Sequence, residues 1–149
     1  MRLYEKHQEP EGVAVFPMKL FAWFRRQKAK PDPCDRVLRV VFAFAEARKL
    51  DEVDQYYVVS IALALLSNDP SEKAMIMLRL VKDQTEFMNE GRPVDLLALQ
   101  TTAAELVGEY KTLMHTGVPF PEVYRCLIDC AGSLRHGAIF FTLAKGSGR

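Results

Sequence analysis

The side chains best suited to chemistry in this chain are its cysteines and histidines, three of each. Cys126 and Cys130 are four residues apart, so a helix would place both thiols on one face, where His115 or His136 could complete a soft-metal site. The sequence contains no second cysteine pair, and Leu127 lies beside these two. Free cysteine is commonly a buried core residue. The sequence therefore favours two core thiols, and we expect no metal ion or other cofactor.

A cysteine nucleophile with a histidine base is the second chemistry that these residues allow. The histidines are His7, His115 and His136, and none follows a glycine-rich turn or lies beside an orienting acid. His115 and His136 come near expected helix C-termini, where a partly cationic imidazole is favourable without any catalytic role. We therefore expect a protein that is not an enzyme, and a small enzyme or metal-binding protein ranks third among the functions considered.

The cysteine count also bears on the redox environment. Together with Cys34 the cysteines form an odd set, and no secretory leader is recognisable, because the apolar run at 13–24 precedes its basic residues. We expect reduced thiols and a cytoplasmic protein. Cys126 and Cys130 should not bond to each other, because one helix would hold them in an unsuitable geometry for a disulfide.

The strongest binding signal is the segment 16–30, which joins aromatic residues to cations and contains no acid. Aromatic residues beside arginine are typical of protein-interface anchors. The same composition suits an anionic membrane surface or nucleic-acid phosphate with base stacking, and packing of the aromatics into the core with solvated cations is a fourth interpretation. The expected partner-binding residues are Trp23, Phe24, Arg25, Arg26, Lys28 and Lys30.

The candidate cysteines, histidines and partner-binding residues must be positioned by the fold. The centre of the expected fold is the stretch 53–66. Between Tyr56 and Leu66 the only polar side chain apart from the two tyrosines is Ser60. A helix without a polar face belongs in a bundle or in a membrane. Acidic residues precede this stretch and Pro70 follows it, so it falls short of the ~20 apolar residues that cross a bilayer. We expect a core helix and no transmembrane segment.

Helix-start residues divide the rest of the chain. Further helices are expected at 16–28, 32–49, 69–90, from Pro93 to Gly117, and at 121–136, with an apolar strap, short strand or last helical turn at 138–144. The expected caps are Asp32, Asp51 and Asp69, with Glu72 completing a capping box. The recurring Asp-Pro helix starts allow helical-hairpin repeats, but the residues between them do not match, so a plain bundle is favoured.

Two of these helices carry regular apolar stripes. In the helix at 69–90 one face is expected to hold Ala74, Leu78, Val81, Thr85 and Met88, and another Ile76, Leu80 and Phe87, so that it contacts neighbours on two sides. The helix after Pro93 carries a heptad seam of Leu96, Leu99, Ala103, Leu106, Tyr110 and Leu113, widened by Leu97, Val107 and Met114. Such a seam fits a bundle, and it could equally close a homodimer.

The sequence thus predicts an all-α fold, an antiparallel bundle of five to six helices around a central apolar helix with a short C-terminal apolar strap. Its expected organisation is a flexible arm at 1–15, one helical domain at 16–145 and a flexible tail at 146–149. The expected function is protein interaction, as an adaptor, inhibitor or accessory factor that docks through a surface including the N-terminal helix. Binding of a membrane surface or nucleic acid through residues 16–30 is the alternative. A net charge of +1 gives no general attraction to either.

Overall fold

The computed structural model describes residues 33–147, and this part of the chain is built from helices with no strand. The helices are α3 (Pro33–Ala47), α4 (Glu52–Leu66), α5 (Pro70–Asn89), α6 (Leu96–His115) and α7 (Phe120–Ser147). The predicted all-α class is confirmed. The expected arm, the helix at 16–28 and the Asp32 cap lie outside the described residues.

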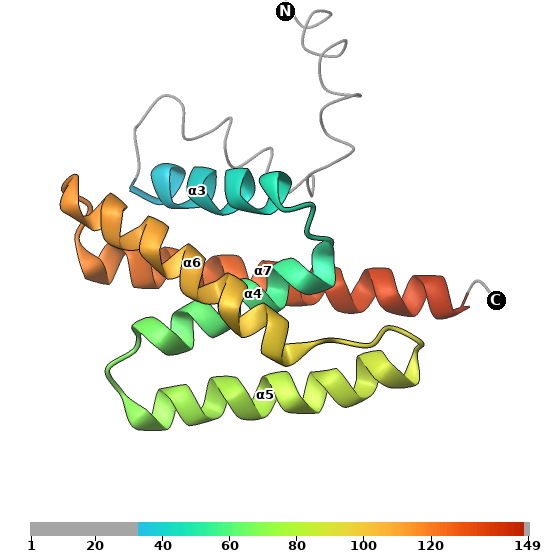
Figure 1. Cartoon of the computed structure of the whole chain (residues 1–149). Helices are drawn as coiled ribbons and strands as arrows, with labels where there is room; N and C mark the ends of the chain where they lie inside the picture. Colours follow the sequence, from blue (N-terminus) through green and yellow to red (C-terminus); the bar gives the residue numbers. More distant parts are fainter. Residues whose placement is uncertain (1–32, 148–149) are drawn as a thin grey trace, which may run out of the picture.

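Each helix runs back in roughly the opposite direction to the one before it, and α4 lies in the middle (Figure 1). Helix α4 packs against α5, α6 and α7, while α3 lies on the other side of the bundle, against α6 and α7. Helix α4 is therefore the central helix, as its composition predicted.

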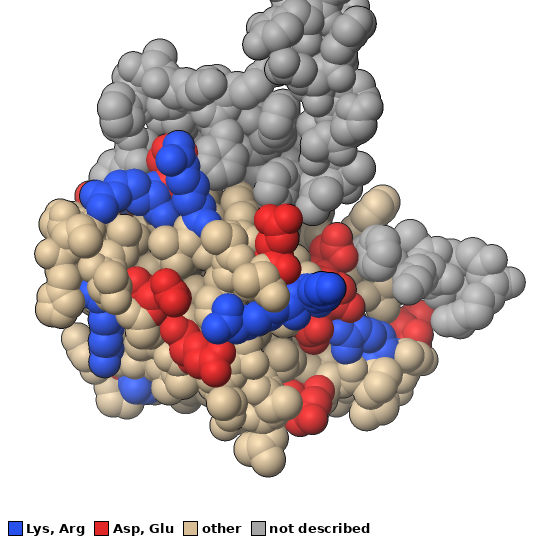
Figure 2. All heavy atoms as spheres, turned by 45° about the horizontal axis from the view of Figure 1, so that its top comes forward, with Lys and Arg blue, Asp and Glu red and all other residues tan. Residues whose placement is uncertain are grey.

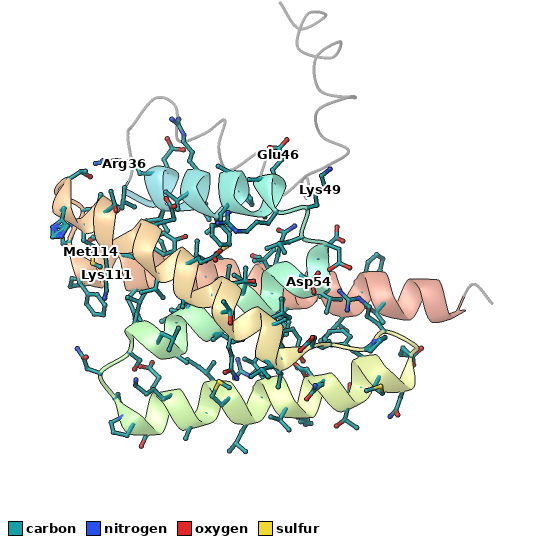
Figure 3. The ribbon with its side chains drawn as sticks, in the orientation of Figure 1. Arg36, Glu46, Lys49, Asp54, Lys111 and Met114 are labelled. Carbon is teal, nitrogen blue, oxygen red and sulfur yellow. A yellow bond between two sulfur atoms is a disulfide. The ribbon has the colours of Figure 1, made fainter. Side chains whose placement is uncertain are left out.

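The sequence of α4 explains its start and its central place. Asp51 caps the helix, since its side chain accepts a hydrogen bond from the backbone N–H of Asp54 at 2.9 Å, and Asp54 lies at the helix start (Figure 3). Arg92, in the loop between α5 and α6, donates to both carboxylates at 2.9–3.0 Å. Ten residues of α4 are buried, so the apolar stretch at 53–66 forms the centre of the core.

The heptad seam of α6 faces the interior of the bundle. Leu99, Ala103, Leu106, Tyr110 and Leu113 are all buried, and the Tyr110 hydroxyl donates to the carbonyl of Val37 in α3 at 3.3 Å. The prediction for Leu97 is wrong, because this residue in the first turn is 76% exposed. Since the other helices cover the seam, it is not available to close a homodimer.

Helix α7 is longer than predicted, and no separate strap follows it. It continues through Gly132 and Gly137 to Ser147, since glycine in a helix interior costs only about 1 kcal/mol relative to alanine. The reason for the continuation is a buried stripe at steps of four, through Leu134, Ala138 and Thr142. The expected apolar strap is therefore the last part of α7, and the helix also takes in the first two residues of the predicted tail.

The cap of α5 is confirmed only in part. Asp69 accepts from the backbone N–H of Ser71 at 2.9 Å, but Glu72 does not complete a capping box. The hydroxyl of Ser67 accepts from the Asp69 N–H at 3.1 Å, and Glu72 instead accepts hydrogen bonds from Ser67 at 3.2 Å and from the Tyr124 hydroxyl at 2.7 Å. Glu72 therefore connects α5 to α7.

Candidate functional site: the exposed face of α5

Helix α5 lies along one edge of the bundle (Figure 1), and its outer face is apolar and uncovered by the described residues. Leu78 is 69% exposed, Met88 54% and Val81 49%. We call Ala74, Leu78, Val81, Thr85 and Met88, all of which are exposed, the α5 seam. The prediction that this face contacts a second neighbour within the fold is wrong. Adjacent exposed apolar residues are typical of an interaction surface.

The opposite face of α5 fixes the helix to α4. Leu80 and Phe87 are buried, and the Tyr57 hydroxyl of α4 donates to the carbonyl of Leu80 at 2.7 Å. The rings of Tyr57 and Phe87 meet edge to face, with 6.1 Å between their centroids. The outer face is therefore presented on a well-anchored helix.

A buried carboxylate reinforces this attachment. Asp83 of α5 accepts hydrogen bonds from the Tyr56 hydroxyl at 2.6 Å and from Arg135 of α7 at 2.8 and 3.0 Å. Burial by itself would raise the pKa of Asp83, but the bonds from Arg135 and Tyr56 outweigh it and hold that pKa below its usual value. The pKa of Tyr56 is raised by burial and by its bond to Asp83. Asp83 is therefore ionised at neutral pH.

Between α5 and α7 lies a groove with α4 as its floor. Two polar links cross it, from Glu72 to Tyr124 and from Asp83 to Arg135. One hollow in the groove has a volume of about 380 Å³ and a second, near the C-terminal end of α5, about 220 Å³. The walls of the larger hollow include Leu63, Met75, Ile76, Arg79, Ile128 and Ala131. Met75 lines this hollow and is exposed beside the α5 seam. The hollow therefore adjoins the seam and offers a recess for an apolar side chain of a docked partner.

The structure corrects the prediction for two of the three cysteines. Cys34 of α3 and Cys126 of α7 form a disulfide, with 5.4 Å between their Cα atoms, although the odd cysteine count had indicated reduced thiols. Only Cys130 follows the prediction of a buried free thiol, and burial, followed by the charge of Asp129, raises its pKa to about 12. Cys130 is therefore a poor nucleophile at neutral pH.

Of the histidines first considered for metal binding or catalysis, His7 lies outside the described residues. His115 ends α6 and His136 lies within α7. Within residues 33–147, no group of three or more histidine, cysteine or acidic side chains has the arrangement of a metal site. None of the described helices is long and apolar enough to span a membrane.

Charges on one face of the described residues are mixed in sign. On the face drawn in Figure 2, lysine and arginine lie close to aspartate and glutamate, without a broad area of one charge. Figure 3 places Arg36 at the same end of the bundle as Lys111 and Met114, and Arg36 donates to the Thr116 hydroxyl at 2.7 Å. The face drawn in Figure 2 therefore adds no basic patch to the cations predicted at 16–30.

The partner-binding residues predicted from sequence, Trp23, Phe24, Arg25, Arg26, Lys28 and Lys30, lie outside the described residues, and their role stays a prediction. The sequence indicates the α5 seam as a regular stripe, but the prediction was that it contacts a neighbouring helix. Polar residues flank it, and Arg79, Lys82 and Glu86 are all exposed. The positions of these polar residues beside the stripe indicate that this side of the helix faces solvent.

Comparison of the chain with protein-family models, with curated proteins and with solved structures finds no match.

Proposed function

We propose that this protein is a non-enzymatic protein-interaction module, an adaptor, inhibitor or accessory factor, whose described docking surface is the α5 seam. The observation that carries the proposal is the exposure of Leu78, Val81 and Met88 on one face of a single helix. Removing apolar surface from water is favourable by roughly 25 cal/mol per Å² buried. Covering these three side chains with a partner therefore favours association.

The spacing of the seam supports a partner that presents an amphipathic helix. Its residues recur at alternating steps of four and three, which is the pattern that packs against another helix. The groove behind Met75 offers a recess for a side chain at the edge of that contact. The aromatic and basic residues at 16–30 remain a proposed second part of the docking surface, and membrane or nucleic-acid binding through them is the alternative function.

Photo-crosslinking tests the proposed surface. Benzoylphenylalanine at position 85, in the full chain and in the cells that normally make it, should give a discrete adduct with a protein. A Leu78→Glu substitution should remove that adduct, because a carboxylate at the centre of the seam would have to be desolvated on docking. Mass spectrometry of the adduct identifies the partner.

The matched control is the same photoreactive residue at position 97, which is also exposed on a helix but lies in α6. We expect no adduct from position 97. Equal crosslinking at both positions, or an adduct at 85 that survives Leu78→Glu, would contradict the proposal.

A further inference from the structure

We infer that the larger hollow between α5 and α7 is a binding site for a small amphipathic carboxylate, a fatty acid of medium chain length. Its carboxylate binds Arg79 and Ser60, and its hydrocarbon chain lies along the apolar walls. The volume of about 380 Å³ falls within the roughly 300–1,000 Å³ of small-molecule sites. This site is distinct from the α5 seam, so a ligand in it goes beyond the proposed interaction function.

The groove between the two polar links is long enough for an extended chain. Helices α5 and α7 run in the same direction (Figure 1). Glu72 contacts Tyr124 at one end of the groove, and the bond from Arg135 to Asp83 lies at the other. The links are eleven residues apart on each helix, which is about 16 Å at the rise of an α-helix. The walls of the hollow include the apolar side chains of Leu63, Ile76 and Ile128.

The floor of the hollow carries a buried hydroxyl without a partner within residues 33–147. Ser60 of α4 lines the hollow and is 5% exposed, yet its hydroxyl makes no hydrogen bond to any of these residues. The hydroxyl of Thr85 in α5, by contrast, donates to the carbonyl four residues earlier in its own helix. No fully enclosed side-chain oxygen of the described residues lacks a partner, so the Ser60 hydroxyl must open into the hollow. It can therefore donate a hydrogen bond to a ligand there.

Positive charge is in excess on one side of this hydroxyl. Arg79 and Arg135 both line the hollow, and both help to lower the pKa of Asp83. Arg135 donates to the two oxygens of that carboxylate, whereas Arg79 makes no hydrogen bond or ion pair with any residue from 33 to 147. Two arginines therefore face one carboxylate, and the guanidinium of Arg79 is left to pair with an anion from solution.

The positions of these groups set the orientation of the ligand. Ser60 lies one turn along α4 from Tyr56, and Arg79 lies one turn along α5 from Asp83. Because Tyr56 and Asp83 are hydrogen-bonded, Ser60 and Arg79 both belong to the Asp83 end of the groove. Glu72, at the other end, already accepts two hydrogen bonds. The anionic head therefore binds beside Arg79, and the chain extends along the apolar walls toward Glu72.

Isothermal titration calorimetry of the full chain with decanoate, below the concentration at which it forms micelles, tests the site. The wild type should bind one decanoate per chain. Acetate lacks the hydrocarbon chain and decylammonium reverses the charge, so each should bind about tenfold more weakly or less. Arg79→Gln should weaken decanoate binding by about tenfold, through loss of charge-assisted hydrogen bonds. The matched control is Lys82→Gln, which removes an exposed cation of α5 that does not line the hollow and should leave the affinity unchanged.

A glycine of α7 allows the hollow to be filled without disturbing the fold. Gly132 lines the hollow, and a Cβ atom there would meet nothing within 4 Å. Gly132→Leu should therefore abolish decanoate binding while the helix is kept, since leucine is a better helix former than glycine. The matched control is Gly108→Leu in α6, where a Cβ atom also meets nothing within 4 Å and which does not line the hollow. Circular dichroism would establish that both variants are folded.

A wild type that shows no saturable binding of decanoate would overturn the inference. Binding that survives Gly132→Leu, an unchanged affinity in Arg79→Gln, or equal binding of decylammonium would do the same. The proposed function fails separately. If decanoate does not bind but position 85 crosslinks to another protein, the interaction surface stands and the ligand site is wrong.

Discussion

Among the residues that α5 buries, Asp83 is the only ionisable one. A buried carboxylate is tolerated when it is paired and hydrogen-bonded, and Tyr56 and Arg135 supply three hydrogen bonds to its two oxygens. These partners lie far from Asp83 in the sequence, and no local pattern predicts such a pairing. The caps at Asp51 and Asp69 could be predicted because their chemistry is contained within one helical turn.

Replacing Asp83 should lower stability in a pH-dependent way. At neutral pH we expect Asp83→Asn to reduce the free energy of unfolding by about 2 kcal/mol, through loss of charge-assisted hydrogen bonds. Because folding lowers the pKa of Asp83, its contribution is complete above the unfolded value of about 4 and is lost as the pH falls through the folded value. Urea denaturation between pH 7 and pH 3 should show the gap between wild type and variant closing only below about pH 4.

The control for this experiment is the exposed pair of Asp35 and Arg39, whose atoms are 2.9 Å apart and whose arginine side chain is 71% exposed. Asp35→Asn should change the free energy of unfolding by less than about 1 kcal/mol, since exposed ion pairs contribute little. A gap for Asp83→Asn that persists unchanged down to pH 3 would show that its effect is steric and not electrostatic.

At the scale of the helix, α5 and α6 show what periodicity can and cannot predict. Both carry apolar residues at alternating steps of three and four, yet the stripe of α6 is buried and that of α5 is exposed. A period identifies a helix and its apolar face, but whether another helix covers that face depends on the packing of the whole chain. In α7 the two glycines suggested that the helix ends near position 136. The helix continues instead, because its buried stripe extends past both glycines.

Alanine substitutions in α6 should destabilise the protein at a buried leucine and have little effect at an exposed one. Leu106 is 1% exposed. Leu106→Ala should lower the free energy of unfolding by about 3 kcal/mol, because the substitution leaves a cavity in the core. Leu97→Ala should cost less than about 0.5 kcal/mol. Equal midpoints for the two variants in chemical denaturation would contradict the burial of the α6 seam.

At the scale of the whole molecule, the disulfide between Cys34 and Cys126 joins α3, the first described helix, to α7, the last. Its cysteines are 92 positions apart. Helix geometry excludes a bond between Cys126 and Cys130, but the sequence gives no geometric reason to prefer Cys126 over Cys130 as the partner of Cys34. Disulfides are typical of oxidising compartments. The cytoplasmic location was predicted from the odd cysteine count, which the disulfide no longer allows as an argument for reduced thiols. The location therefore stays a prediction.

Reduction of this disulfide should lower the free energy of unfolding by about 3 kcal/mol, because the bond limits the entropy of a long unfolded loop. Thermal unfolding with and without a reducing agent measures the effect, and the double variant Cys34→Ala, Cys126→Ala should be insensitive to the agent. Thiol titration of the denatured, unreduced protein should find one of the three cysteines free. Three free thiols would contradict the bond.

The disulfide also makes the chain from Cys34 to Cys126 a closed ring that contains α4, α5 and α6 complete. A single cut by a protease in the loop before α5 or the loop after it would open this ring without releasing a fragment. The nicked protein would retain all its helices on one covalent framework until the bond is reduced. Damage to the loops that hold the α5 seam in place would therefore not by itself detach that surface from the bundle.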